Sequence, residues 1–318
     1  MSQKIHHIFI LPDPPSPCRL DQALTKLLPD YSRTQIQAWI ESGQVLLNGI
    51  TTQAKTKIHG GEKIEITTTL KRQPAWEAEE IPLTIIYEDE ALIVINKPAG
   101  MVVHPGAGNT QSTLLNALLH HAPALKALPR AGIIHRLDKD TSGLLLVAKT
   151  PGAYKKLTSQ LKKRTILREY QTIVAGTLIS GATIDAPLTR HPVQRKRMAV
   201  LDTGKPAITH YRIMEKYRAF TRLKVKLETG RTHQIRVHMA YIRHPIVGDK
   251  TYGPRLQIPK KSSPALADFL RQFKRQALHA FTLGITHPVT KEWIQWEASL
   301  PQDMQELIAV LKEDTACS

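Results

Sequence analysis

The stretch AGIIHRLDKDTSGLLLVAKT (residues 131–150) places a cluster of charged side chains between two apolar runs. The runs GII and GLLLVA have the composition of buried strands. Between them lies the polar segment HRLDKDTSG (residues 135–143), at the point where the chain enters its own core. Its ionisable residues are His135, Arg136, Asp138, Lys139 and Asp140. Such a segment either caps a turn or builds a functional site, and the rest of the chain is needed to distinguish the two.

Two further segments place ionisable side chains at the ends of predicted strands. REYQTIV (residues 168–174) opens a strand with Arg168 and Tyr170, and ETGRTHQIRVH (residues 228–238) joins a strand to a helix through Arg231. Taken singly, each has an ordinary structural explanation, as a turn cap, a strand aromatic or a solvated residue at a helix start. Taken together, an acidic residue, a tyrosine and an arginine at three loop–strand junctions of one domain predict a single site.

The composition indicates a globular protein with a polyanionic partner. Lys plus Arg number 44 and Asp plus Glu number 27, so the formal net charge of the 318 residues is +17. A balance this basic is typical of proteins that bind nucleic acid, although a protein with a basic surface and no such partner has the same signature. The two cysteines, Cys18 and Cys317, define neither a disulfide framework nor a zinc site. No secretion signal or membrane-spanning run is visible, so we expect a cytoplasmic protein that contacts no membrane.

The helix and strand patterns predict two domains joined by a linker. Residues 1–17 are rich in proline near their end and are expected to form a tail, and residues 18–66 a small αα-β module with a hairpin turn at Asn-Gly. Residues 67–80 show no amphipathic period and are predicted to be the linker. Residues 81–300 mix strands and helices without strict βαβ alternation, which predicts an α+β fold with a mixed, mostly antiparallel sheet. Residues 301–318 are predicted to form a last, surface helix and a tail.

Motifs for nucleotide cofactors, for nucleophilic hydrolysis and for metal binding are missing from the sequence. There is no P-loop, no complete GxGxxG and no GxSxG elbow. His233 and His238 lie five residues apart on a predicted helix, where their side chains point to different faces and do not make a zinc pair. Asp138 and Asp140 are too few carboxylates for a metal-dependent nuclease. We therefore predict neither a cofactor nor a metal ion.

The motifs of the chain resemble those of the pseudouridine synthases, which modify uridines in structured RNA. HRLDKDTSG resembles the catalytic-aspartate motif of that family. NKPAGMVVHP (residues 96–105), REYQTIVAG (residues 168–176) and the long segment from LETGRTHQIRVH onward (residues 227–253) resemble its other motifs, in the family's order. Residues 18–66 resemble an S4-type RNA-binding module, which a subset of the family carries. The resemblance implies the pseudouridine synthase fold over nearly the whole chain, and it is closest to the branch acting on a hairpin of 23S large-subunit ribosomal RNA.

The resemblance also implies an isomerisation that needs one carboxylate and no cofactor. Making pseudouridine breaks the N1–C1′ bond of a uridine, turns the uracil and rejoins it through C5, which requires an ionised carboxylate near the sugar. Asp138 matches that carboxylate, and Arg231 matches its cationic partner. Arg136 matches the residue that enters the space left by the flipped uridine, and Tyr170 the ring that packs on the uracil. The motifs leave open whether the reaction begins by attack at C1′ or by deprotonation at C2′.

Basic residues are expected to bind the phosphates around the flipped base. Many lie in the runs KKRTILR (residues 162–168) and RHPVQRKR (residues 190–197), although any single one could be solvated loop charge. The predicted RNA contacts are Arg136, His135, Arg19, Arg33, Arg168, Arg195, Lys196 and Arg197. The expected partner is 23S ribosomal RNA, including its form in pre-50S particles, bound by a monomeric enzyme. The alternative is a non-catalytic RNA-binding assembly factor, which has no need of an acidic residue such as Asp138 beside an anionic ligand.

Overall fold

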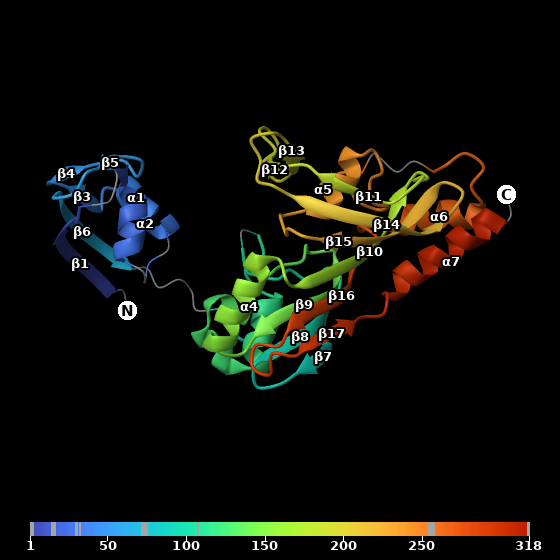
Figure 1. The fold of residues 1–318 in the computed structure, drawn as a ribbon, viewed down its shortest axis with the longest axis horizontal. Helices are drawn as coiled ribbons and strands as arrows, with labels where there is room; N and C mark the ends of the chain where they lie inside the picture. The colour runs from blue at the N-terminus through green and yellow to red at the C-terminus, as the bar shows by residue number, and fades with distance from the viewer. Residues whose placement is uncertain are drawn as a thin grey trace. The chain divides into compact units, whose positions relative to one another are not determined.

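The structure, a computed structural model, describes residues 3–13, 17–28, 31, 33–70, 76–106, 108–253 and 258–316. The chain divides into two compact units, Met1–Ala75 and Trp76–Ser318 (Figure 1). Each unit has a hydrophobic core of its own. Cys317, one of the two cysteines of the sequence, lies outside the described residues.

The N-terminal unit packs two helices against a small antiparallel sheet. The helices are α1 (Leu20–Leu27) and α2 (Arg33–Glu41). The sheet has the order β1-β6-β3-β4, with strands β1 (Gln3–Ile10), β3 (Val45–Leu47), β4 (Ile50–Thr51) and β6 (Lys63–Leu70). A separate short ladder joins β2 (Cys18–Arg19) to β5 (Lys57–Ile58). Asn48 and Gly49 both have positive φ between β3 and β4, which is the predicted Asn-Gly hairpin turn.

Two boundaries of this unit differ from the sequence prediction. Residues 3–10 were expected to belong to a tail, but they form β1, which pairs antiparallel with β6 along its whole length. The prolines that suggested a tail begin only at Pro12, after the strand has ended, while Ile5 is buried and Ile8 and Ile10 are exposed in the alternation of an edge strand. For the same reason the predicted linker starts too early, because β6 continues to Leu70. Residues 14–16 and 71–75 of the predicted tail and linker lie outside the described residues.

The catalytic-motif segments all belong to the second unit, whose described strands form one nine-stranded sheet. The order is β11-β14-β15-β10-β16-β9-β8-β7, with β17 also paired to β16. Its strands are β7 (Ile85–Glu88), β8 (Leu92–Lys97), β9 (Ser142–Ala148), β10 (Leu167–Ala175), β11 (Ala182–Asp185), β14 (Ile208–Lys216), β15 (Phe220–Leu227), β16 (Leu278–Thr286) and β17 (Trp293–Glu297). Only the β16–β9 pair is parallel among these, so the predicted mixed, mostly antiparallel sheet of an α+β fold is confirmed.

Helices cover this sheet, and a small hairpin projects from it. Figure 1 shows α4 (Pro151–Lys163) near the β7–β9 end and α6 (Pro264–Gln272) and α7 (Gln302–Ala316) near the β11–β14 end. The remaining elements are α3 (Leu114–His121), η1 (Pro123–Ala127), η2 (Pro129–Gly132), α5 (Gln234–Tyr241) and the hairpin of β12 (Leu188–Arg190) with β13 (Met198–Val200). The prediction that the last helix lies on the surface is wrong for one face of α7, since Met304, Leu307 and Leu311 recur at helical spacing and join the main core.

Strand β9 explains why the quoted sequence has an unbroken apolar run. All its residues are buried, and alternate side chains enter different cores: Leu145 and Val147 one, Leu144 and Leu146 the other. A strand covered on both faces needs apolar residues at every position. Gly143 has φ +113°, and a Cβ there would lie 2.3 Å from the Ala280 carbonyl oxygen, so only glycine allows β16 to approach this closely. The polar segment therefore ends at one of the tightest contacts of the sheet.

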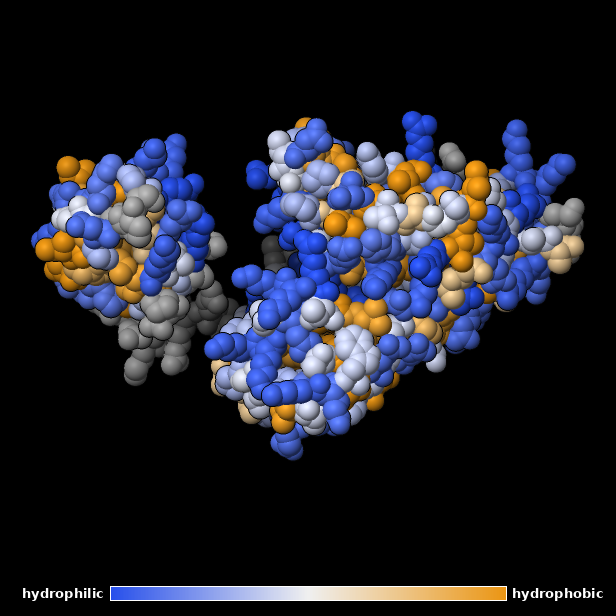
Figure 2. Space-filling model, viewed as in Figure 1, coloured by the Kyte–Doolittle hydropathy of each residue, from blue (hydrophilic) through white to orange (hydrophobic). Residues whose placement is uncertain are grey.

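On the face seen in Figure 2, hydrophilic residues cover most of the second unit, and apolar residues form only small patches. Such a surface suits a charged partner better than an apolar one.

Candidate active site

The loop that carries Asp138 is held by two hydrogen bonds, one within the loop and one to β9. The Thr141 amide donates to the Asp138 carbonyl (3.1 Å) and closes the turn. The Leu146 amide donates to Nε2 of His135 (3.0 Å) at the start of the loop. Burial, with the charge of Arg168 adding to it, lowers the pKa of His135 to about 3, so the ring is neutral at physiological pH and able to accept this bond.

A buried lysine holds the loop from the other side. Lys97 is 0 % exposed, and its ammonium donates to the carbonyls of Pro98 (2.7 Å), Met101 (3.0 Å) and Lys139 (3.0 Å). Three acceptors match the three donors of an ammonium group. Burial lowers the pKa of Lys97 to about 7, and the negative charges of Asp140 and Asp138 only partly offset this. The NKPAG segment thus serves to tie the Asp138 loop to β8.

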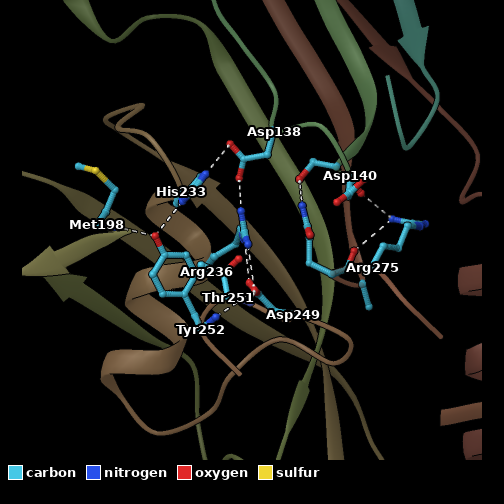
Figure 3. Close-up of polar contacts among 12 residues, drawn as sticks. Asp138, Asp140, Met198, His233, Arg236, Asp249, Thr251, Tyr252 and Arg275 are labelled. Carbon is cyan, nitrogen blue, oxygen red and sulfur yellow. Dashed lines mark hydrogen bonds and ion pairs between the residues drawn. The ribbon is translucent and has the colours of Figure 1, made fainter. Parts of the chain in front are cut away.

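Asp138 shares a buried arginine with a second carboxylate (Figure 3). Arg236, on the first turn of α5, donates from Nη1 to Oδ2 of Asp138 (3.0 Å) and from Nε and Nη2 to both oxygens of Asp249 (2.7 and 2.9 Å). Asp249 also accepts from the amides of Thr251 and Tyr252. Burial alone would raise the pKa of Asp249, but its bonds and attraction to Arg236 outweigh burial and hold that pKa below its ordinary value. The guanidinium is therefore fixed by Asp249 and presented to Asp138.

Asp138 opens onto a cavity of about 600 Å³ that brings together the three predicted segments. Tyr170 lines it from β10, and its side chain is re-aimed by a register shift between Glu169 and Tyr170 in the pairing with β16. Burial raises the pKa of Tyr170, and the charge of Asp138 adds to the rise, so the phenol keeps its proton. The carboxylate of Asp138 and the ring of Tyr170 therefore line the same cavity. A planar ligand ring can pack against the tyrosine there and place its own substituent next to the carboxylate.

The predicted pairing of Arg231 with Asp138 is wrong, because Arg236 takes that place. Arg231 lies in the loop before α5, where its Nε donates to the Pro206 carbonyl (3.2 Å) and its amide to Oε1 of Gln234 (3.0 Å). It still lines the cavity. The sequence reasoning missed Arg236 because both arginines lie in one short motif, and the start of the helix decides which of them points inward. An arginine within the buried segment QIRVHM was the signal that could have identified it.

Comparison with known proteins agrees with this geometry. The profile of the family described as RNA pseudouridylate synthase matches residues 91–241, and that of the S4 domain matches residues 18–64. A protein named ribosomal large subunit pseudouridine synthase D, from Pasteurella multocida, is 54 % identical over 93 % of this chain and 92 % of its own length. The chain belongs to the RNA pseudouridylate synthase family.

This pseudouridine synthase is also similar to a second named relative and to a solved structure. A ribosomal large subunit pseudouridine synthase D of Haemophilus influenzae is 55 % identical over 93 % of this chain and 92 % of its own length. Among solved structures, human RNA pseudouridylate synthase domain containing 4 matches with a TM-score of 0.57 and 24 % identity, covering 72 % of this chain and 93 % of that one. The similarity to the human structure shows that the two proteins share a fold.

Three predicted RNA contacts of the synthase surround the cavity but differ in exposure. Arg136 is exposed at its edge. Arg168 is 6 % exposed and donates to the Glu228 carbonyl (3.2 Å), and burial lowers its pKa. Its Nε has no hydrogen-bond partner among the described residues. His135 uses its Nε2 for the Leu146 amide, so the structure gives it a role inside the protein, whereas its contact with RNA stays a prediction.

The basic loop of the synthase, residues 191–197, connects β12 to β13 and carries Arg195, Lys196 and Arg197. Arg195 and Lys196 are exposed. The Arg197 guanidinium lies 5.2 Å from the centre of the Tyr252 ring, and the Arg236 guanidinium lies 5.1 Å from it. The loop is therefore attached through Tyr252 to the arginine that holds Asp138.

In the S4 unit, the two predicted RNA-binding arginines share one buried carboxylate. Asp21 is 0 % exposed and accepts hydrogen bonds from Arg19, Arg33 and Gln37. Both arginine side chains remain 44 % exposed. Asp21 thus orients two partly exposed guanidiniums, a geometry compatible with the predicted phosphate contacts.

Among the described residues, no three or more His, Cys, Asp or Glu side chains lie close enough together to hold a metal ion. No helix in the described part of the chain is long and apolar enough to cross a membrane.

Proposed function

We propose that this chain converts specific uridines of a 23S ribosomal RNA hairpin to pseudouridine, with Asp138 as the group that acts at the sugar. The observation that carries the proposal is the ion pair of Asp138 with Arg236 at a cavity also lined by Tyr170. The family membership, and the names of relatives more than half identical to this chain, support the reaction and its substrate class.

The isomerisation of uridine to pseudouridine requires a carboxylate with a fixed orientation. When the N1–C1′ bond breaks, positive charge develops at the sugar, and a carboxylate next to it acts as nucleophile or as stabiliser. One oxygen of Asp138 is bound by Arg236, which leaves the other free for the sugar. The uracil then turns and bonds to C1′ through C5, which loses its proton as N1 gains one, so no atoms are added or lost.

We propose that Tyr170 and Arg136 stabilise the flipped state of the target uridine. Tyr170 is held in a strand and keeps its ring at the cavity, where it can stack on the uracil. Arg136 stands two residues before Asp138 and is exposed, so it can enter the space that the uridine leaves in the RNA. Arg231, which lines the same cavity, is assigned a contact with RNA.

We propose that two basic regions bind the RNA around the target uridine. Arg195, Lys196 and Arg197 present one region in the loop between β12 and β13, and Arg19 and Arg33 present the other in the S4 unit. Their contacts with phosphates would make affinity strongly dependent on salt. We further propose that the enzyme works as a monomer in the cytoplasm on RNA in pre-50S particles, since the site is built from one chain.

The test is chemical mapping of pseudouridine in large-subunit RNA from cells that lack the protein. Wild-type protein should restore the missing modification, and Asp138→Asn should not, although it should bind the RNA with similar or higher affinity because a negative charge is removed. The control is Asp140→Asn, which removes a neighbouring carboxylate of the same loop. Unchanged pseudouridine in the deleted strain, or full restoration by Asp138→Asn, would count against the proposal.

A further inference from the structure

A chain of polar groups leads from the basic loop to Asp138 (Figure 3). The Met198 amide, one residue after Arg197, donates to the hydroxyl of Tyr252 (2.8 Å). That hydroxyl lies 2.7 Å from Nδ1 of His233, and Nε2 of His233 lies 3.8 Å from Oδ1 of Asp138. Arg236 binds the other oxygen of Asp138, and no donor among the described residues lies within hydrogen-bond distance of Oδ1.

The surroundings of His233 determine which ring nitrogen carries the proton. Burial lowers the pKa of His233, and the attraction of Asp138 only partly offsets this, so the ring is neutral near pH 7. Nε2 faces a carboxylate, which accepts but cannot donate. The Tyr252 hydroxyl already accepts from Met198, and Nδ1 is the acceptor within reach of its own proton. Both neighbours therefore favour the tautomer with hydrogen on Nε2 and a free lone pair on Nδ1.

The backbone at His233 is unusual and supports a functional position. His233 has φ 57° and ψ 21°, the left-handed region, immediately before α5 begins at Gln234. This conformation costs a residue with a side chain roughly 1 kcal/mol, and such strain is retained where surrounding contacts require it. Here it places the imidazole between Tyr252 and Asp138, 19 % exposed.

We propose that His233 is a positioning residue for Asp138: its Nε2–H binds Oδ1 when RNA is bound, while Tyr252 holds the ring in that tautomer. The proposal rests on the proposed role of Asp138. A movement of roughly 1 Å turns the 3.8 Å approach into a hydrogen bond of ordinary length. With Arg236 on Oδ2 and His233 on one lone pair of Oδ1, the carboxylate cannot rotate, and the second lone pair of Oδ1 stays available to the sugar.

Three variants of the full-length protein test the proposal. His233→Gln keeps a donor of similar reach, whereas His233→Met has nearly the same shape and lacks the donor, and both suffer the same backbone strain. Tyr252→Phe keeps the ring between Arg197 and Arg236 and removes only the hydroxyl. Single-turnover rates at saturating ribosomal RNA and dissociation constants are measured for each, together with unfolding curves.

We expect His233→Met to react roughly 10- to 100-fold more slowly than His233→Gln, the range for a lost hydrogen bond to a charged group, with RNA affinity unchanged within about twofold. Tyr252→Phe should also slow the step without weakening binding. Equal rates for the Met and Gln variants, or a loss that lies in affinity alone, would overturn the proposal.

A second measurement does not depend on activity. Nitrogen-15 NMR of the histidine rings distinguishes the two neutral tautomers, and we expect the Nε2–H form for His233 in wild-type protein and a mixture in Tyr252→Phe. The Nδ1–H form in the wild type would refute the inference. If the wild type forms no pseudouridine in any large-subunit RNA, the proposed function fails, and the ring spectra still decide the tautomer.

Discussion

Replacement of Arg236 by methionine should destabilise the catalytic unit by about 3–5 kcal/mol, the cost of removing one partner from a buried ion pair. Arg236 is 6 % exposed, and the Asp249 side chain, which it binds through two nitrogens, is 0 % exposed. Methionine has a similar length and packs well in irregular spaces, so little of the loss should come from a cavity. The loss should come from the carboxylate that is left without its cation.

A second substitution separates this structural cost from the chemistry. In the double variant Arg236→Met/Asp249→Asn the uncompensated charge is gone, and the new amide oxygen can still accept from Thr251 and Tyr252. Stability should therefore return to within about 2 kcal/mol of wild type, because replacing both partners of a buried pair is close to neutral. Activity should stay about 100- to 1,000-fold below wild type, since Asp138 still lacks the group that fixes its oxygen.

Urea unfolding measures the stability of the three proteins, and single-turnover tritium release from labelled RNA measures their rates. RNA affinity, determined in parallel, should change little, because Arg236 is buried. If the double variant regains its rate together with its stability, Arg236 acts only by holding the fold, and the reasoning given for Asp138 is wrong.

Three further predictions concern the loop, acid stability and the basic hairpin. Lys97→Met should lower the free energy of unfolding by about 2–4 kcal/mol, because three buried carbonyls lose their donor, and urea unfolding should detect it. His279 is buried with its pKa lowered to about 4, so the unfolded chain takes up a proton on it below pH 6.5 that the folded chain does not. This one group should lower stability by roughly 1.4 kcal/mol per pH unit as the pH falls from 6.5 to 4, and His279→Gln should make the slope of stability against pH shallower by that amount in unfolding curves. Arg195→Ala and Lys196→Ala should each reduce the slope of log affinity against log salt by roughly 0.7, as measured by filter binding, and leave the rate at saturating RNA unchanged.

The sequence was sufficient for the sheet type and for the residues that meet in the cavity. Asp138 and Tyr170 could be placed in one site because each lies at a strand end within a long motif, and strand ends on one side of a sheet converge. The continuous apolar run before Lys149 predicted a buried strand, and β9 is such a strand.

The sequence did not predict which arginine of the α5 motif is buried, nor the strand of residues 3–10. Arg231 and Arg236 lie in one motif, and the residue at which α5 begins decides which of them enters the interior. The strand of residues 3–10 was missed because its partner, β6, lies about sixty residues further along the chain, and a single edge strand has little pattern of its own. The hydrogen bond between His135 and the Leu146 amide is a contact that side-chain patterns do not reveal.

The position of β16 in the sheet sets an order for the synthesis of the active protein. β16 (Leu278–Thr286) lies between β10 and β9, and its parallel contact joins His279 to Ser142 and Ala280 to Gly143, just after the Asp138 loop. On a translating ribosome the central sheet cannot be completed until residue 286 has left the exit tunnel. The S4 unit has its own core and is complete some two hundred residues earlier. A nascent chain therefore acquires its RNA-binding module long before it can assemble the site that would act on RNA.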